Sequence, residues 1–211
     1  MHPTSTTYSG SRPRRTHHIK RRSASTIHHA PALAEAQGTP LTHFVTINFS
    51  EAGVAPEKAS EVFAKLRDDK FSPWVRRPPR NSGHAKARPT FAWVLENGGN
   101  VIAAHWLVHL PEGRVTDFSA RLPVWLGAVT GADAHAVAPV IHMRPAYRPR
   151  GARKYMLKGI EPGIARFYGI RPEDQGAVDG KRAGVSQSLG PSTKRRLREE
   201  GRYPTGRTHR R

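Results

Sequence analysis

The stretch FAWVLENGGNVIAAHWLVH, residues 91–109, decides the fold of this chain. It contains two runs of β-forming residues, and Asn97-Gly98-Gly99-Asn100 between them has the composition of a tight turn. The pattern predicts a β-hairpin with arms over residues 91–96 and 101–109. Because side chains alternate along a strand, His105 and His109 share one face of the second arm with aliphatic residues.

Further elements are expected on both sides of this hairpin. Upstream, residues 43–49 form a β-rich run and Pro56 opens a helix, whereas Pro73 to Pro89 has the composition of a loop. Downstream, we expect a helix over 117–129, a strand over 137–143, and helices over 150–158 and 162–168. This order predicts an α+β fold, in which helices pack mainly on one face of an antiparallel sheet.

Composition divides the chain into three parts. Residues 1–40 are basic and rich in Ser, Thr and Pro, which predicts a disordered arm whose basic runs either contact phosphates or stay solvated. Residues 41–175 hold the periodic apolar pattern of the folded domain. Residues 176–211 are predicted to be a basic, disordered tail with one short helix over 193–200, capped by Ser192.

The formal net charge of +19, from 35 Lys and Arg against 16 Asp and Glu, favours a polyanionic partner. Nucleic acid fits better than a membrane surface, since we identify no basic amphipathic helix, lipidation signal or membrane-spanning run. The absence of cysteine excludes disulfides, thiolate metal sites and a cysteine nucleophile, and fits a reducing cytoplasm. We therefore expect a cytoplasmic protein that binds nucleic acid.

Two groups of residues have the chemistry of a reactive site. Glu96 ends one arm of the hairpin, and a carboxylate beside the imidazole of His105 on the other arm could bind a divalent metal. Tyr155 and Lys158 are three residues apart and share a helix face, so the ammonium group could favour the tyrosine phenolate. Alternatively, the histidine is a structural residue, Tyr155 packs on the domain and Lys158 is solvated.

The strand at residues 44–49, the His-bearing strand and the helix with Tyr155-x-x-Lys158 together resemble the HUH endonuclease superfamily, the rolling-circle replication initiators and relaxases. The resemblance covers about residues 42–170. It implies nicking and joining of single-stranded or origin DNA through a 5′-phosphotyrosine link, with Tyr155 as nucleophile and Lys158 as its cationic partner. It also implies a bound Mg²⁺ or Mn²⁺, with His105 and Glu96 as ligands.

The sequence departs from the family pattern at one position. The family has two histidines two residues apart, and Ala103 stands where the first would be. His105 and His109 are four residues apart, which on a strand is about 13 Å between Cα atoms and hard for one metal to span. His142, on the next predicted strand, or His43 is left as the substitute ligand. A DNA-binding but inactive member of the family is the alternative.

Basic and aromatic residues are candidates for contact with nucleic acid. Trp74 could stack on a base, with a core or hinge role as the alternative. The full set of candidates is Trp74, Arg76, Arg77, Arg153, Lys154, Lys181, Arg182, Lys194, Arg195 and Arg196. Three functions stay open at this point: a metal-dependent DNA-nicking initiator, a non-catalytic replication or transcription regulator with the same fold, and a basic structural protein that binds nucleic acid. No small-molecule cofactor is evident from the sequence.

Overall fold

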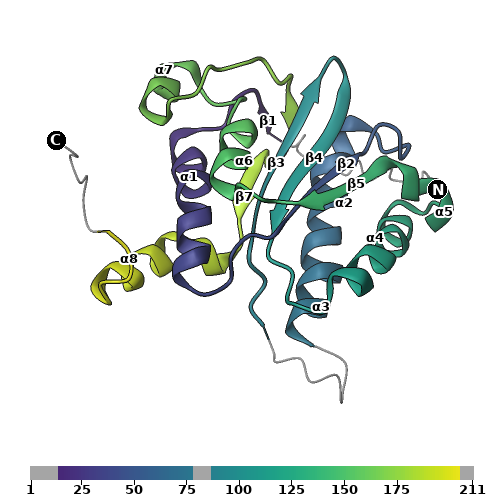
Figure 1. The fold of residues 1–211 in the computed structure, drawn as a ribbon. Helices are drawn as coiled ribbons and strands as arrows, with labels where there is room; N and C mark the ends of the chain where they lie inside the picture. Colours follow the sequence, from purple (N-terminus) through teal and green to yellow (C-terminus); the bar gives the residue numbers. More distant parts are fainter. Residues whose placement is uncertain (1–13, 78–86, 205–211) are drawn as a thin grey trace, which may run out of the picture.

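A five-stranded antiparallel sheet forms the centre of the computed structural model, which describes residues 14–77 and 87–204 (Figure 1). The strand order is β5-β2-β4-β3-β7. The strands are β2 (His43–Asn48), β3 (Phe91–Gly98), β4 (Val101–Val108), β5 (Ile141–Pro145) and β7 (Ala183–Val185). A separate short ribbon pairs β1 (Arg15–Thr16) with β6 (Val178–Asp179). The α+β class predicted from the sequence is therefore confirmed.

The hairpin β3–β4 follows the prediction to within two residues at each end. Gly99 and Asn100 form its turn with φ values of 61° and 64°, as a two-residue turn with both positions left-handed requires. The register places Glu96 opposite Ala103 and Val94 opposite His105. Directly paired residues point to the same face of a sheet, so the hairpin alone brings Glu96 and His105 to one face.

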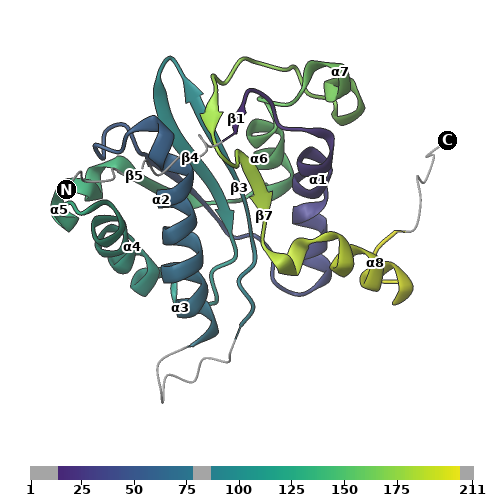
Figure 2. The ribbon, with the colours of Figure 1, turned by 180° about the vertical axis from the view of Figure 1, so that it is seen from behind.

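Helices cover both faces of the sheet, where the sequence predicted mainly one (Figures 1 and 2). On one face, which we call the aromatic face, the continuous helical segment α2 (Ala59–Lys65), η2 (Leu66–Phe71) and α3 (Ser72–Arg76) packs beside α4 (Val115–Thr130). On the other, the reactive face, lie α1 (Arg21–Ala36) and α6 (Pro149–Met156). Both faces of the central strands are consequently apolar over most of their length.

The prediction of a disordered arm over residues 1–40 is wrong for the part that the structure describes. Residues 21–36 form α1, whose buried positions repeat at helical spacing: Ala24, Ile27, Ala30, Pro31, Leu33 and Ala34. Most of these side chains are small, so the segment lacks the large apolar residues that signal a folded element, yet they let the helix approach the sheet closely. Residues 1–13, including part of the first basic run, lie outside the described residues.

The prediction of a disordered C-terminal tail is also wrong for residues 176–204. β7 pairs with β3 and extends the sheet, and Leu189 and Leu197 are buried in the core of the reactive face. The short helix is confirmed as α8 (Pro191–Glu199), although Gly190 rather than Ser192 occupies its N-cap. It follows η5 (Gln187–Leu189). Residues 205–211 lie outside the described part of the chain.

Shorter elements connect these parts and account for two shifted boundaries. Asp133 caps α5 (Ala134–Val137) through its side chain, and η3 (Ala138–Val140) follows, so the strand predicted over 137–143 starts only at Ile141. The predicted loop from Pro73 begins instead as α3, and residues 78–86 of that loop are outside the described range. The other short elements are η1 (Pro56–Lys58), α7 (Pro162–Ala165) and η4 (Arg166–Tyr168).

Candidate active site

Four polar side chains from two distant stretches of the chain meet on the reactive face. Glu96 comes from β3 and His105 from β4, whereas Tyr155 lies in the last turn of α6 and Lys158 just after it. Met156 and Leu157 are buried in the core of this face and anchor the end of α6 to the sheet. Because Tyr155 and Lys158 are three residues apart, both project toward the hairpin.

The four side chains form a closed ring of short polar contacts, which we call the quartet. Glu96 Oε1 lies 2.6 Å from His105 Nε2, and Glu96 Oε2 lies 3.2 Å from Lys158 Nζ. Lys158 Nζ in turn is 3.3 Å from the Tyr155 hydroxyl oxygen, which is 3.4 Å from His105 Nε2. Each member therefore contacts two others, and no member can change its charge without affecting the rest.

His105 is held in one orientation by the residues around it. It is 4% exposed, and its ring stacks on Phe44 with a centroid distance of 5.7 Å and an interplanar angle of 21°. The edge of the Tyr155 ring packs against it at 4.9 Å. Its Nδ1 lies 3.1 Å from Thr46 Oγ1. Nε2 lies within hydrogen-bond distance of Glu96 and Nδ1 within that of the threonine hydroxyl, so both ring nitrogens have partners.

Two residues of the quartet carry opposite charges that reinforce each other. Burial raises the pKa of Glu96, but the hydrogen bond and charge of His105 and the charge of Lys158 outweigh it, and the pKa is lowered overall. Burial lowers the pKa of Lys158, and the charge of Glu96 and the hydrogen bond to Tyr155 raise it above its usual range. At neutral pH the pair is a carboxylate and an ammonium group. The ammonium also lies 4.3 Å from the centroid of the Tyr155 ring.

Tyr155 is the accessible member of the quartet. It is 45% exposed and borders a cavity of about 260 Å³ whose lining includes Lys154, Lys158 and Arg171, with Glu173 as the one carboxylate. The tyrosine hydroxyl thus combines a buried polar network on one side with a basic, open surface on the other. The Lys158 ammonium group donates to this hydroxyl oxygen, which is the atom of a tyrosine that acts as a nucleophile.

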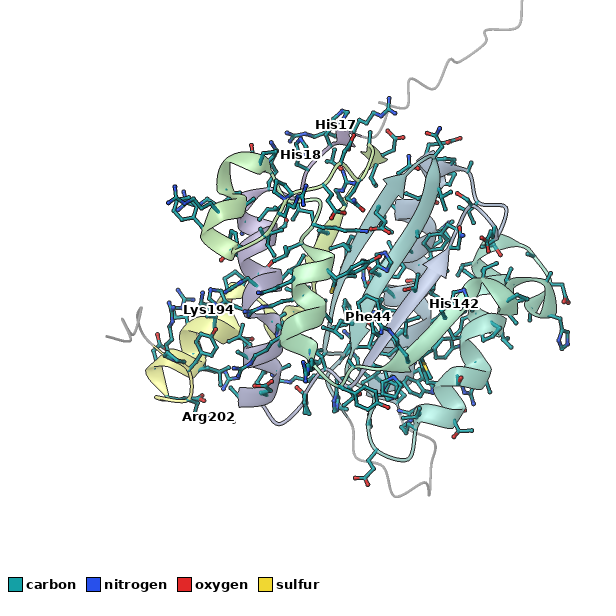
Figure 3. The ribbon with its side chains drawn as sticks, turned by 45° about the horizontal axis from the view of Figure 1, so that its top comes forward. His17, His18, Phe44, His142, Lys194 and Arg202 are labelled. Carbon is teal, nitrogen blue, oxygen red and sulfur yellow. The ribbon has the colours of Figure 1, made fainter. Side chains whose placement is uncertain are left out.

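Of the four predicted metal ligands, the structure brings together only Glu96 and His105. His109 follows the end of β4, where its Nδ1 lies 2.8 Å from the carbonyl oxygen of Pro40. His142 lies on β5 (Figure 3) opposite Thr46, which itself lies opposite His105, so the whole of strand β2 separates the two histidines. His43 alternates with Phe44 along β2 and belongs to the other face of the sheet.

The donor set around Glu96 does not fit a metal centre built by the protein. Both carboxylate oxygens already contact nitrogen atoms, of His105 and Lys158, and Ala103 opposite Glu96 supplies no ligand. Within residues 14–77 and 87–204, no group of three or more His, Cys, Asp and Glu side chains is placed to hold a metal ion. The ammonium group of Lys158, 3.2 Å from Glu96 Oε2, already neutralises the charge of the Glu96 carboxylate.

Three of the predicted nucleic-acid contacts have structural roles instead. Trp74 is 9% exposed, donates from Nε1 to Asp117 at 2.8 Å and is covered by the guanidinium of Arg114, so its ring cannot accept a base. Arg182 is 4% exposed and donates to backbone carbonyls, among them those of Gln175 and Gly176. Arg153 is half-buried and donates to the carbonyl of His28 at 2.6 Å.

The other basic candidates remain available at the surface. Lys194 is partly exposed, and the exposed ones are Arg76, Arg77, Lys154, Lys181, Arg195 and Arg196. Phe44 and Thr46, which orient His105, were not among the predicted site residues. The alternation in residues 43–49 is the signal that could have found them, since it places them on the face opposite to Val45 and Ile47.

Comparison with known proteins finds no match among family models, curated proteins or solved structures. Among the described helices, none combines the length and the apolar character that crossing a membrane requires.

Proposed function

We propose that this protein cuts and rejoins a single DNA strand, with Tyr155 as the nucleophile, in the manner of a rolling-circle replication initiator acting in the cytoplasm. The observation that carries the proposal is the convergence of Tyr155, Lys158, His105 and Glu96 in one ring of contacts no longer than 3.4 Å. The hairpin and the helix that supply these residues are far apart in sequence, since 50 positions separate His105 from Tyr155.

The proposed step is a transesterification at phosphorus. The Tyr155 hydroxyl oxygen forms a bond to the phosphorus of a DNA phosphodiester, and the bond from phosphorus to the 3′ oxygen breaks. The Glu96–His105 pair accepts the phenolic proton and returns one to the departing 3′ oxygen. Rejoining is the same step in reverse, since the 5′-phosphotyrosine keeps the energy of the broken bond. No net oxidation or external co-reactant is needed.

Positive charge supports this step at the atoms where negative charge develops. Lys158 lies beside the attacking oxygen, and Lys154 and Arg171 line the adjacent cavity, where the scissile phosphate would lie. Dependence on Mg²⁺ or Mn²⁺, implied by the resemblance to HUH endonucleases, stays a prediction. The assay below tests it when it is run in parallel with Mn²⁺, with Mg²⁺ and with a chelator.

The test is a covalent adduct that survives SDS. Single-stranded DNA is labelled at its 3′ end, because the fragment with the new 5′-phosphate stays on the protein. We expect a labelled adduct with the unmodified chain and none with Tyr155→Phe. Tyr147→Phe is the matched control, since Tyr147 is 88% exposed and outside the quartet. Tyr147→Phe should unfold within ~0.5 kcal/mol of the parent, as surface substitutions do. Tyr155→Phe should lose about 1 kcal/mol, because it removes the hydroxyl that Lys158 and His105 contact.

Two results would overturn the nucleophile assignment. An adduct retained by Tyr155→Phe would move the attack elsewhere, with Tyr147 and Tyr168 as the next candidates. Absence of an adduct across a library of origin-like strands, with tight DNA binding intact, would leave a non-catalytic DNA-binding regulator. That alternative is favoured by one observation: Ala103 lies opposite Glu96, at the position where the HUH endonucleases that the sequence resembles have a ligand.

A further inference from the structure

A second cavity, of about 670 Å³, lies on the aromatic face, away from the quartet. Phe91 and Trp93 contribute to its lining, and they alternate along β3 with Val94 and Glu96, so they point to the opposite side of the sheet. Its charged lining residues are Arg67, Asp68, Arg76, Arg88 and Lys181. We call this cavity the basic pocket. Four cations against a single carboxylate leave it strongly positive.

Arg67 is a fixed positive charge in this pocket. It is 9% exposed, and its guanidinium binds the Asp68 carboxylate with two contacts of 3.0 and 2.7 Å. Its central carbon lies 4.7 Å from the centroid of the Trp93 ring, and Lys181 Nζ lies 5.8 Å from the same ring. The aromatic side chains therefore support the cations instead of offering free faces for base stacking.

The helix that carries Arg67 has an unusual backbone at this point. Residues Leu66–Phe71 form a π-helical segment between α2 and α3, and the Ser72 hydroxyl donates to the Arg67 carbonyl at 2.8 Å. Such segments are rare and are frequently found at functional sites. The segment directs both Arg67 and Asp68 to the lining of the pocket.

We propose that the basic pocket binds the phosphodiester backbone of a single-stranded nucleic acid, by charge and without selecting bases. It would be a second contact for the strand that Tyr155 is proposed to cut, so this inference rests on the proposed function. Arg76, Arg88 and Lys181 are exposed, and a pocket of about 670 Å³ is far larger than one phosphate group needs. Guanidinium groups suit phosphate oxygens, since their planar donors bind two oxygens at once.

The absence of free aromatic faces sets a specific expectation. An oligothymidylate and an abasic strand of the same length should bind with affinities within about twofold of each other, because stacking contributes little. The triple variant Arg76→Gln, Arg88→Gln, Lys181→Gln should bind both strands at least about tenfold more weakly at low salt. The slope of log affinity against log salt should fall by about 2, since a single strand contributes ~0.7 per phosphate contact.

The measurement is fluorescence anisotropy of labelled strands over a salt series, with every variant built on Tyr155→Phe so that no adduct forms. The matched control is the triple variant Arg15→Gln, Arg21→Gln, Arg166→Gln, which removes the same charge from exposed positions outside both the basic pocket and the Tyr155 cavity. It should weaken binding much less. Equal losses of affinity in the two triple variants would overturn the proposal that the basic pocket binds the strand, because only net charge would then matter.

Two further experiments distinguish this inference from binding of a free phosphate compound and from failure of the nuclease proposal. Displacement of the strand by millimolar pyrophosphate or thymidine monophosphate, with no effect of strand length, would overturn the backbone proposal in favour of a free phosphate compound. With Tyr155 restored, the pocket variant should still form adduct at saturating DNA. If adduct never forms but the pocket variant alone loses affinity, the nuclease proposal fails while the pocket stands.

Discussion

The two faces of the central sheet are covered by different kinds of side chain. On the aromatic face, Trp93 and Trp106 pack edge-to-face with Phe63, and Trp106 also contacts Phe71 and Phe118. On the reactive face, the core consists mainly of small and aliphatic side chains, many of them from α1, and Phe44 of β2 packs against the polar quartet. The same strand serves both, because His105 and Trp106 are adjacent and point in opposite directions.

This difference indicates that one face mainly stabilises the fold and that the other carries the reactive groups. The aromatic face supplies large, fully buried surfaces, and these stabilise the sheet whatever happens on the other side. The reactive face tolerates a buried carboxylate, imidazole and ammonium group because they satisfy one another. Substitutions on the first face should therefore change stability, and those on the second should change chemistry first.

Trp106→Ala should have the largest effect on stability. Trp106 is fully buried among four aromatic neighbours, and truncating such a side chain costs about 3–5 kcal/mol. Urea unfolding followed by circular dichroism measures the loss. Trp125→Ala, at a partly buried position of α4, is the control and should cost clearly less. A loss below about 1 kcal/mol for Trp106→Ala would contradict the division between the faces.

Ala103→His should turn the quartet into a metal site. Position 103 lies opposite Glu96 and two residues from His105 on the same face of β4, so a carboxylate and two imidazoles would converge. At a Mn²⁺ concentration of ~100 times the dissociation constant, binding would stabilise the fold by about 2.7 kcal/mol. Thermal unfolding with and without Mn²⁺ measures this. We expect no such shift for Ala104→His, which points to the opposite face, and an equal shift there would refute the proposed geometry.

Glu96→Gln should destabilise the fold by about 1–2 kcal/mol, because it leaves the Lys158 ammonium group without its counter-charge. The Glu96 and Lys158 side chains are only 18% and 20% exposed, so water compensates little. A double-mutant cycle with Lys158→Met, measured by urea unfolding, isolates the pair. Additive effects of the two substitutions would mean that the ion pair contributes nothing to stability.

The smallest expected effect is a dependence of stability on pH, which arises from two histidines of α1. Burial, followed by the charge of Arg153 for His28 and of Lys194 for His29, lowers the pKa of each histidine from 6.5 to about 4. Both are therefore neutral in the folded chain, and the unfolded chain binds more protons between pH 6.5 and 4. Stability should be flat above pH 6.5 and decline as the pH falls through this window.

Urea unfolding at pH 7, 5.5 and 4.5 measures that decline. The double variant His28→Gln, His29→Gln should show a shallower slope over the same range, because its side chains do not titrate. Since both histidines keep part of their surface in contact with water, the difference should be modest. An identical slope in the two proteins would assign the acid sensitivity to other groups.

The hairpin could be predicted from sequence because all its determinants are local. Alternating apolar residues and an Asn-Gly-Gly-Asn turn fix the register, and the register alone places Glu96 near His105. Likewise, the helical spacing of Tyr155 and Lys158 predicts that they share a face. The meeting of these two pairs could not be predicted, since it depends on how the end of α6 packs across β4.

The elements that were not predicted, α1 and β7, depend on features that local composition does not show. In α1 half of the buried residues are alanines, and the helix also carries arginines and histidines, so average composition hides the helical spacing of Ala24, Ile27 and Leu33. β7 has only three residues and becomes a strand because β3 offers it an edge. Trp74 and Arg182 were assigned to the surface from residue type, whereas tertiary partners bury both.

The guanidinium of Arg182 has a consequence for how the chain is made. It binds the backbone carbonyl of Thr16, 166 positions earlier, next to the ribbon of β1 with β6. At ~5–20 residues per second, a ribosome takes roughly 8–30 s to synthesise the intervening length. The segment leading into α1 thus lacks this contact, and those of Ile19 with Gly159 and Glu161, through most of translation. Ribosome-bound chains stalled before residue 182 should leave that segment open to protease, and longer ones should protect it.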